Sequence, residues 1–283
     1  MGYYYRDPCS APSFGSPMLM CRSISILAIL FAFVSMPVAH AEDKWDYIEK
    51  LWRAAGDDSS KVEQALEMDC KRIESFADKG AKLYRQKQYT AARHEFLTQV
   101  FLLEYCDTGG RNWDHRLAVA YNNVALTYVQ EGKALHARAW MSIIADDPTS
   151  RFNLEKIRSQ LDAVPERIEG EYVQYAGQGI WTNIQVNKER GKYEIGAEFL
   201  RAGPRAILGG LNMGNIGLEM PLNLRHALYR GSEEGSEAET TGEIGCEIAF
   251  DFGKNTAHVK TLKGACGFGA GVYADGEFYR MED

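Results

Sequence analysis

Residues 244–259, IGCEIAFDFGKNTAHV, decide the C-terminal half of the fold. Apolar side chains stand at every second position from residue 244 to residue 252, and the acidic Glu247 and Asp251 alternate with them. This period of two predicts a strand with one buried and one solvated face. The Gly-Lys-Asn turn at 253–255 then returns the chain through a second apolar run. The stretch therefore predicts an antiparallel β-hairpin.

The same alternation recurs through residues 166–283. Even-numbered residues from Ile180 to Val186 favour one face, and after a turn at 189–191 a run beginning at Tyr193 continues that face. The remaining signals are apolar runs around Ile207, Ile216 and Leu228, and a last turn at residues 274–276 that we expect to join strands at 272–273 and 278–279. These segments predict about eight to ten short strands that form an antiparallel β-barrel or sandwich.

Residues 42–165 carry a helical pattern. They contain 5 glycines against 20 in residues 166–283, and their apolar residues recur three and four positions apart. Among the expected helices are one from Trp45 to Ala55, one capped by Ser59 and Ser60 that runs to about Gln86, one from Ala91 to Tyr105 and a last one from Arg151 to Val164. The fold class is therefore α+β and multidomain, with a helical domain at 42–165 and a β domain at 166–283.

Two segments of the helical half resemble tetratricopeptide repeats. The positions that carry the resemblance are Gly80, Leu83, Tyr89, Ala92 and Phe96 in the first segment, and Tyr121, Val124, Ala125, Tyr128, Gly132, Ala137, Met141, Ile144 and Pro148 in the second. The resemblance implies helical hairpins whose concave groove binds a protein partner. It places in that groove Glu74, Tyr84, Arg85, Asn122, Leu126 and Gln130. The alternative is that these helices simply pack against the β domain.

Residues 1–41 have the features of a secretory signal peptide. Arg22 precedes an apolar run at residues 24–34, and Ala39-His40-Ala41 forms a cleavage site before Glu42, whereas the extension before Met18 fits no signal architecture. The run is shorter than the ~20 residues of a membrane span, so we expect cleavage rather than an uncleaved anchor, and no span in the mature chain. This site and the lack of an Asn-x-Ser/Thr sequon favour a bacterial periplasmic protein.

The cysteine positions predict two disulfides. After removal of residues 1–41 the cysteines are Cys70, Cys106, Cys246 and Cys266. An even number in an oxidising compartment favours pairing. Because two fall in each half of the chain, we expect Cys70 to pair with Cys106 and Cys246 with Cys266. Buried free thiols are the alternative, and a zinc site is disfavoured because no C-x-x-C motif accompanies them.

No motif in the sequence carries a recognisable chemistry. A net charge of -7 and a pI near 5.5 leave no basic surface for nucleic acid. The glycine-rich residues 267–271 lie too near the C-terminus to open a dinucleotide-binding helix, and no histidine pair has metal-ligand spacing. We therefore expect no cofactor, no metal, no catalytic residue and no enzymatic activity. The alternative is a hydrolase whose carboxylates, such as Glu243, Glu247 and Asp251, assemble in three dimensions.

Two further features indicate a partner. The segment 230–239 contains Glu233, Glu234, Glu237 and Glu239, and such a run is either a solvated loop or an acidic finger that attracts a basic protein. Residues 246, 264–270 and 275–280 resemble the end of the barrels of small exported, lysozyme-inhibitor-like envelope proteins. This resemblance implies a β domain that acts in the cell envelope.

We therefore expect a periplasmic protein–protein interaction module with a partner in the cell envelope. Its most specific form is an inhibitor of, or an immunity protein against, a cell-wall-active enzyme. The alternative is a β-barrel that binds a glycan fragment or another small ligand on a helical scaffold. Its candidate stacking aromatics are Tyr172, Tyr175, Trp181, Tyr193, Tyr229 and Tyr273.

Overall fold

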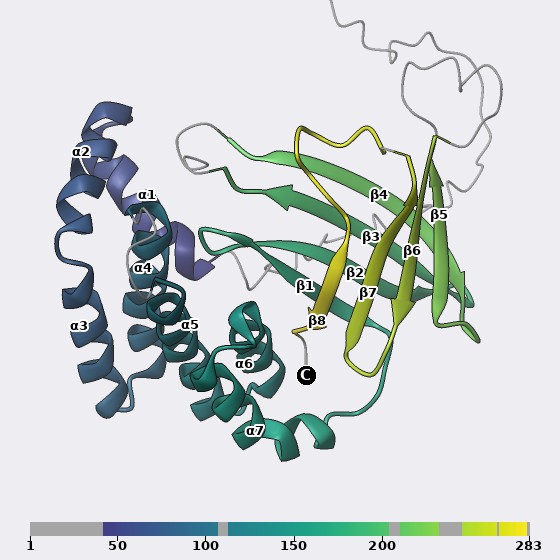
Figure 1. Ribbon diagram of the computed structural model, residues 1–283, viewed down its shortest axis with the longest axis horizontal. Coiled ribbons are helices and arrows are strands. Elements are labelled where there is room, and N and C mark those ends of the chain that lie inside the picture. Colours follow the sequence, from purple (N-terminus) through teal and green to yellow (C-terminus); the bar gives the residue numbers. More distant parts are fainter. Residues whose placement is uncertain (1–41, 107–112, 204–209, 232–244, 265, 282–283) are drawn as a thin grey trace, which may run out of the picture. The chain divides into compact units, whose positions relative to one another are not determined.

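The computed structural model describes residues 42–106, 113–203, 210–231, 245–264 and 266–281. These residues belong to one unit, residues 39–283, in which helices come first along the chain and a β-sheet follows (Figure 1). This order confirms the predicted α+β fold class.

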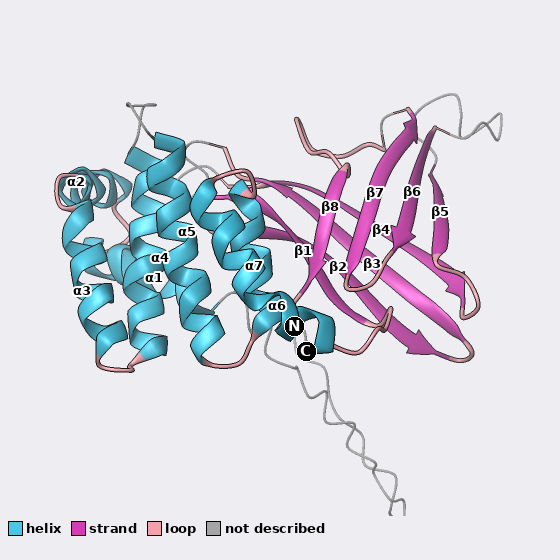
Figure 2. Ribbon diagram, turned by 60° about the horizontal axis from the view of Figure 1, so that its bottom comes forward, coloured by secondary structure: helices cyan, strands magenta, loops and turns pink. Residues whose placement is uncertain are grey.

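Seven α-helices and one short 3-10 helix make up the helical part of the described chain. They are α1 (Glu42–Ala55), α2 (Ser59–Cys70), α3 (Ile73–Arg85), α4 (Tyr89–Cys106), α5 (Trp113–Gln130), α6 (Ala134–Met141), η1 (Ser142–Ile144) and α7 (Pro148–Ala163). Helices α3 to α6 pack as successive antiparallel neighbours (Figure 2). Lys87 and Gly132, with φ of 62° and 77°, reverse the chain after α3 and α5.

Small residues let these helices approach closely. Ala92, Ala125 and Ala137, one on each of α4, α5 and α6, are fully buried in the helical core. A buried alanine places only a methyl group between two backbones, so larger side chains from the neighbouring helices fill the space around it. All three belong to the positions that carry the repeat resemblance in the sequence.

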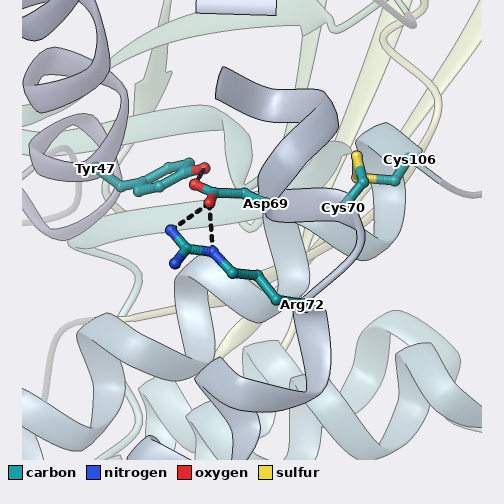
Figure 3. Close-up of a disulfide and its surroundings, with 5 residues drawn as sticks. All are labelled: Tyr47, Asp69, Cys70, Arg72 and Cys106. Atoms are coloured by element: carbon teal, nitrogen blue, oxygen red, sulfur yellow. Dashed lines mark hydrogen bonds and ion pairs between the residues drawn. A yellow bond between two sulfur atoms is a disulfide. The ribbon is translucent and has the colours of Figure 1, made fainter. Parts of the chain in front are cut away.

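The predicted single helix from Ser59 to about Gln86 is wrong, because α2 ends at Cys70 and α3 begins at Ile73. The buried Asp69 carboxylate accepts hydrogen bonds of 2.7 Å from the Tyr47 hydroxyl and from Arg72 Nε (Figure 3). The Arg72 N–H donates to the Asp69 carbonyl at 3.0 Å. Together with the disulfide at Cys70, these bonds hold residues 71–72 in a turn.

Two helix starts also differ from prediction. The cap of α2 is Asp58, whose carboxylate accepts from the Ser60 and Lys61 N–H groups, so Ser59 and Ser60 are already helical. Helix α7 begins at Pro148 rather than at residue 151, because Asp147 caps it and proline is well suited to a first helical turn.

Eight strands follow in the described residues. They are β1 (Gly170–Gly177), β2 (Ile180–Glu189), β3 (Lys192–Arg201), β4 (Asn212–Pro221), β5 (His226–Gly231), β6 (Cys246–Phe252), β7 (Thr256–Lys263) and β8 (Gly276–Arg280). Their spatial order is β4-β3-β2-β1-β8-β7-β6-β5, and each pair is antiparallel. Since β1 pairs with β8, the strands follow chain order around a nearly closed barrel that ends at β4 and β5 (Figure 2).

Aromatic side chains fill the inside of this barrel. Tyr172, Phe199, Phe250 and Phe278 are fully buried there and belong to one apolar cluster. The even residues of β2 from Ile180 to Val186 are buried and the odd ones are not, as the alternation predicts. The barrel therefore has a packed core formed by one face of each strand.

The expected strand at 272–273 is wrong. Gly267 and Gly271, with φ of 69° and 72°, interrupt the extended conformation, and the Val272 N–H turns back to the Gly269 carbonyl at 3.0 Å. The Asp275 carboxylate then accepts from the Thr261 N–H at 2.8 Å. The segment before β8 is thus an irregular connection, and the predicted run around Ile207 lies outside the described residues.

Both predicted disulfides are confirmed. Cys70 and Cys106 join the end of α2 to the end of α4 with their Cα atoms 5.7 Å apart, and Cys246 and Cys266 join β6 to the connection after β7 with Cα atoms 5.2 Å apart. Each bond closes a loop within one type of architecture. Such closure stabilises the fold by restricting the unfolded chain.

Candidate functional site

A small hollow lies on the helical part between α3 and α5. It holds about 150 Å³, and its lining residues are Ala81, Tyr84, Arg85, Phe96, Asn123 and Leu126. Gly80 allows α4 to come close here, since a Cβ atom at Gly80 would lie 2.5 Å from a ring carbon of Phe96. The nearly buried Phe96 ring therefore forms a rigid wall. A hollow of this size has room for one apolar side chain.

Polar contacts hold the surrounding helices in place. Glu74 on α3 pairs with Arg116 on α5 at 3.0 Å, and the Tyr89 hydroxyl donates to Gln130 at 3.3 Å. The rings of Tyr84 and Tyr89 lie edge to face with their centroids 5.4 Å apart. Burial raises the pKa of Tyr84. Its hydroxyl thus stays protonated at neutral pH and can donate a hydrogen bond at the hollow.

The predicted groove residues do not all lie together. Tyr84, Arg85 and Leu126 come together in the hollow, whereas Glu74 and Gln130 lie near opposite ends of the same two helices. Asn122 lies elsewhere: it is 2% exposed, donates to Ser150 Oγ at 2.8 Å and accepts from Asn153 at 2.7 Å. These bonds place the Asn122 side chain against α7.

The neighbouring Asn123 lines the hollow instead, and sequence analysis missed it. Two adjacent asparagines occupy the sequence at this point, and they differ by about 100° around a helix of 3.6 residues per turn. The apolar pattern leaves the helix phase uncertain by that amount, so it could not decide which of the two faces outward.

A half-buried carboxylate joins the helices to the first β-hairpin. The Glu104 carboxylate on α4 accepts hydrogen bonds from the hydroxyls of Tyr121 and Tyr175 and from the Gln178 N–H. The Tyr175 hydroxyl in turn accepts from the Gly179 N–H at 2.6 Å. Burial raises the pKa of Tyr121 and Tyr175, so both phenols stay protonated as donors. This network fixes the β1–β2 turn on α4 and α5.

Aromatic rings surround that junction. Trp140 on α6 lies edge to face with Trp181 on β2, centroids 5.0 Å apart, and Tyr175 lies 4.9 Å from Trp181. Thus Tyr175 and Trp181, two of the predicted sugar-stacking aromatics, serve the contact between helices and barrel. Tyr172 and Tyr193 belong to the barrel core and Tyr229 packs against it, whereas Tyr273 is 75% exposed.

A polar trough lies on the outer face of β2, β3 and β4. It holds about 480 Å³, and its floor contains Gly196 and Gly217, which pair directly across β3 and β4. Neither glycine has another atom within 4 Å of where a Cβ would stand, and neither has a positive φ. The polar side chains that line the trough are Gln185, Asn187, Glu194 and Glu219.

Two histidine–carboxylate pairs in the described part of the chain connect one secondary-structure element to another. His115 lies 2.8 Å from Asp147, which caps α7, and His226 lies 2.7 Å from Asp251, its partner across β5 and β6. Among the described residues no group of three or more His, Cys, Asp or Glu side chains is placed to hold a metal ion. Within that same part of the chain, no helix has both the length and the apolarity to cross a membrane.

The acidic residues Glu233, Glu234, Glu237 and Glu239, and Glu243 beside them, lie outside the described residues. Comparison with protein-family models, curated proteins and solved structures found no match. The tetratricopeptide-like and lysozyme-inhibitor-like resemblances therefore have no relative to support them.

Proposed function

We propose that this chain is a protein-binding module and that the face of α3 and α5 is its docking surface. The observation that carries the proposal is that Tyr84, Arg85 and Leu126, expected from sequence to contact a partner, line one hollow. Apolar walls beside a positive charge suit an anchor residue of another protein, because a few buried side chains provide most of the affinity of an interface.

The chemistry of the hollow defines the partner segment. Leu126, Ala81 and the Phe96 ring offer an apolar floor, and the Tyr84 hydroxyl and exposed Arg85 offer donors. The matching segment is an exposed loop with one medium-sized apolar side chain next to a carboxylate or a carbonyl. Arg85 would donate to that oxygen, and the apolar side chain would fill the 150 Å³.

The finer form of the proposal is a periplasmic inhibitor of, or immunity protein against, a cell-wall-active enzyme. It rests on the signal-peptide features of residues 1–41, on the disulfides, which persist in oxidising compartments, and on the acidic segment 230–239. The acidic segment would steer a cationic enzyme toward the chain. The hollow would supply the specific contact.

An affinity capture from envelope extract tests the proposal. Residues 42–283, produced oxidised, serve as bait, and bound proteins are identified by mass spectrometry. Two single variants alter the hollow. R85E reverses the charge beside it and N123R fills it, and neither of the two replaced residues is buried. The matched control is K188E at the exposed end of β2. A stoichiometric partner lost with R85E or N123R but kept with K188E supports the proposal, and capture unaffected by all three refutes it.

Glycan binding is a second candidate, and the trough over Gly196 and Gly217 favours it. A glycine in the middle of a strand destabilises that strand by about 0.5–1 kcal/mol relative to alanine, and it often marks a close approach by a ligand. Here neither packing nor backbone conformation explains the two glycines. A sugar ring could lie on this floor while the amides and carboxylates around it bind hydroxyl groups.

The substitution Gly217→Val tests whether this glycine serves the fold or leaves room for a ligand. Valine suits strands and meets open space here, so the variant should unfold at equal or higher urea concentration than the parent. Thermal shift and calorimetry with soluble peptidoglycan fragments should detect binding by the parent and none by the variant. Equal binding by both, or none by the parent, removes this candidate.

A further inference from the structure

A cleft separate from the α3–α5 hollow lies between α7, Arg138 of α6 and the turn that joins β6 to β7. It holds about 540 Å³, which is within the range of sites for small ligands. Its lining residues are Arg138, Arg151, Leu154, Glu155, Arg158, Leu161, Asp162, Lys254 and Asn255. Four of these side chains are cationic and two are acidic, although the whole chain carries a net charge of -7.

The cations of this cleft are only partly neutralised. Arg158 pairs with Glu155 at 2.5 Å. By contrast, Arg138 donates to the Asn255 carbonyl, and Lys254 donates to the Asp162 carbonyl at 3.0 Å. A main-chain carbonyl satisfies a hydrogen bond without cancelling a charge. Within the described residues no ion pair involves Arg151, so positive charge remains along one side of the cleft.

Arg138 is held in a position that suits an anion. Its guanidinium lies 5.3 Å from the centre of the Tyr279 ring, and burial lowers its pKa to about 10, so it remains charged at neutral pH. The Glu277 carboxylate, which acts on this pKa in the opposite direction, does not line the cleft. The Arg138 Nε atom is buried and has no hydrogen-bond acceptor among the described residues.

Asn255 adds an unused acceptor to the same cleft. It is 2% exposed, and its Oδ1 atom has no donor among the described residues. Its carbonyl already accepts from Arg138 and from the Arg280 N–H, which keeps the residue in place with a φ of 63°. A buried polar atom without a partner costs stability unless something supplies the bond.

We propose that this cleft binds a small organic anion that has an apolar body. The carboxylate, phosphate or sulfonate head would lie among Arg138, Arg151 and Lys254. The body would lie against the side chains of Leu154 and Leu161, and a hydroxyl or amide N–H on the ligand would meet Asn255. This site shares no lining residue with the α3–α5 hollow, so it stands whether or not the chain also binds a protein.

Fluorescence titration with two matched dyes tests the site. Anilinonaphthalene sulfonate carries an anionic head on an apolar body, and N-phenylnaphthylamine has nearly the same body without the charge. The full oxidised chain should bind the sulfonate at one site and the neutral dye at least about tenfold more weakly, the difference expected of charge-assisted hydrogen bonds. The double variant R151Q/K254Q should weaken sulfonate binding about tenfold.

The matched control is Lys188→Gln, which removes an exposed cation on β2. Far-ultraviolet circular dichroism checks that each variant is folded. Arg151 and Lys254 are both exposed, so their substitution leaves the core intact. Sulfonate binding that the double variant weakens and the control leaves unchanged supports the proposal. Equal affinity for both dyes, equal loss with the control, an unaffected double variant, or no binding at all overturns it.

Discussion

Replacing Glu104 with glutamine should weaken the attachment of the helices to the barrel. In the parent, one carboxylate oxygen accepts from the Tyr121 and Tyr175 hydroxyls and the other accepts from the Gln178 N–H. Glutamine keeps one acceptor and turns the other into a donor, so either a hydroxyl or the N–H loses its acceptor. The Tyr175 oxygen cannot easily compensate, because the Gly179 N–H already donates to it.

The size of the effect follows from these bonds. Loss of the negative charge weakens two charge-assisted hydrogen bonds by about 1 kcal/mol each. One buried donor without an acceptor adds about 1 kcal/mol. We therefore expect E104Q to lower the free energy of unfolding by about 3 kcal/mol, which is a large part of the stability of an ordinary domain.

Urea titration followed by circular dichroism and by tryptophan fluorescence measures this change. Trp140 and Trp181, two of the five tryptophans of the chain, meet at the junction, so fluorescence is sensitive to its opening, whereas circular dichroism reports helices and strands together. The matched control is E155Q, which removes a carboxylate that is 61% exposed and should change stability by less than about 0.5 kcal/mol. If E104Q is no more destabilising than E155Q, the junction does not depend on this carboxylate and the reasoning fails.

Three further predictions concern the scaffold. Changing Cys70 and Cys106 to serine opens a loop with a sequence separation of 36 and should cost about 4 kcal/mol in urea titration; reducing agent should destabilise the parent by more than this, because it also opens Cys246–Cys266. Gly80→Ala brings a methyl group against Phe96 and should cost about 1–3 kcal/mol in urea titration. Because the Tyr121 pKa is raised by burial, its stabilising effect is complete below the unfolded value of about 10 and is lost at higher pH; Tyr121→Phe should flatten that alkaline loss.

Residues that alternate with a fixed period were predictable. The strand that begins at Cys246 and the even residues of β2 show their buried face in the sequence, since a period of two leaves no choice of face. The cysteine pairing was also predictable, because a change of composition near residue 165 assigns two cysteines to each architecture. Both signals depend only on the types and order of residues along the chain, so a single sequence contains them.

Contacts between distant residues were not predictable. The break between α2 and α3 has no proline or glycine to announce it; it depends on Tyr47 reaching Asp69 from another helix. The Glu104 junction and the contact of Arg138 with Asn255 join positions 71 and 117 residues apart. Nothing in a periodic pattern identifies such partners, so the cationic cleft could be recognised only after folding brought its walls together.

The α3–α5 hollow and the cationic cleft differ in how they depend on the helix–barrel junction. The walls of the cationic cleft come from α6 and α7 on one side and from the β6–β7 turn on the other, so loosening the junction separates them. The α3–α5 hollow takes all its lining residues from α3, α4 and α5. E104Q should therefore weaken binding of the anionic dye while partner capture persists. Loss of both together would show that the helices cannot keep their arrangement without the barrel, and would make the junction part of the protein-binding surface as well.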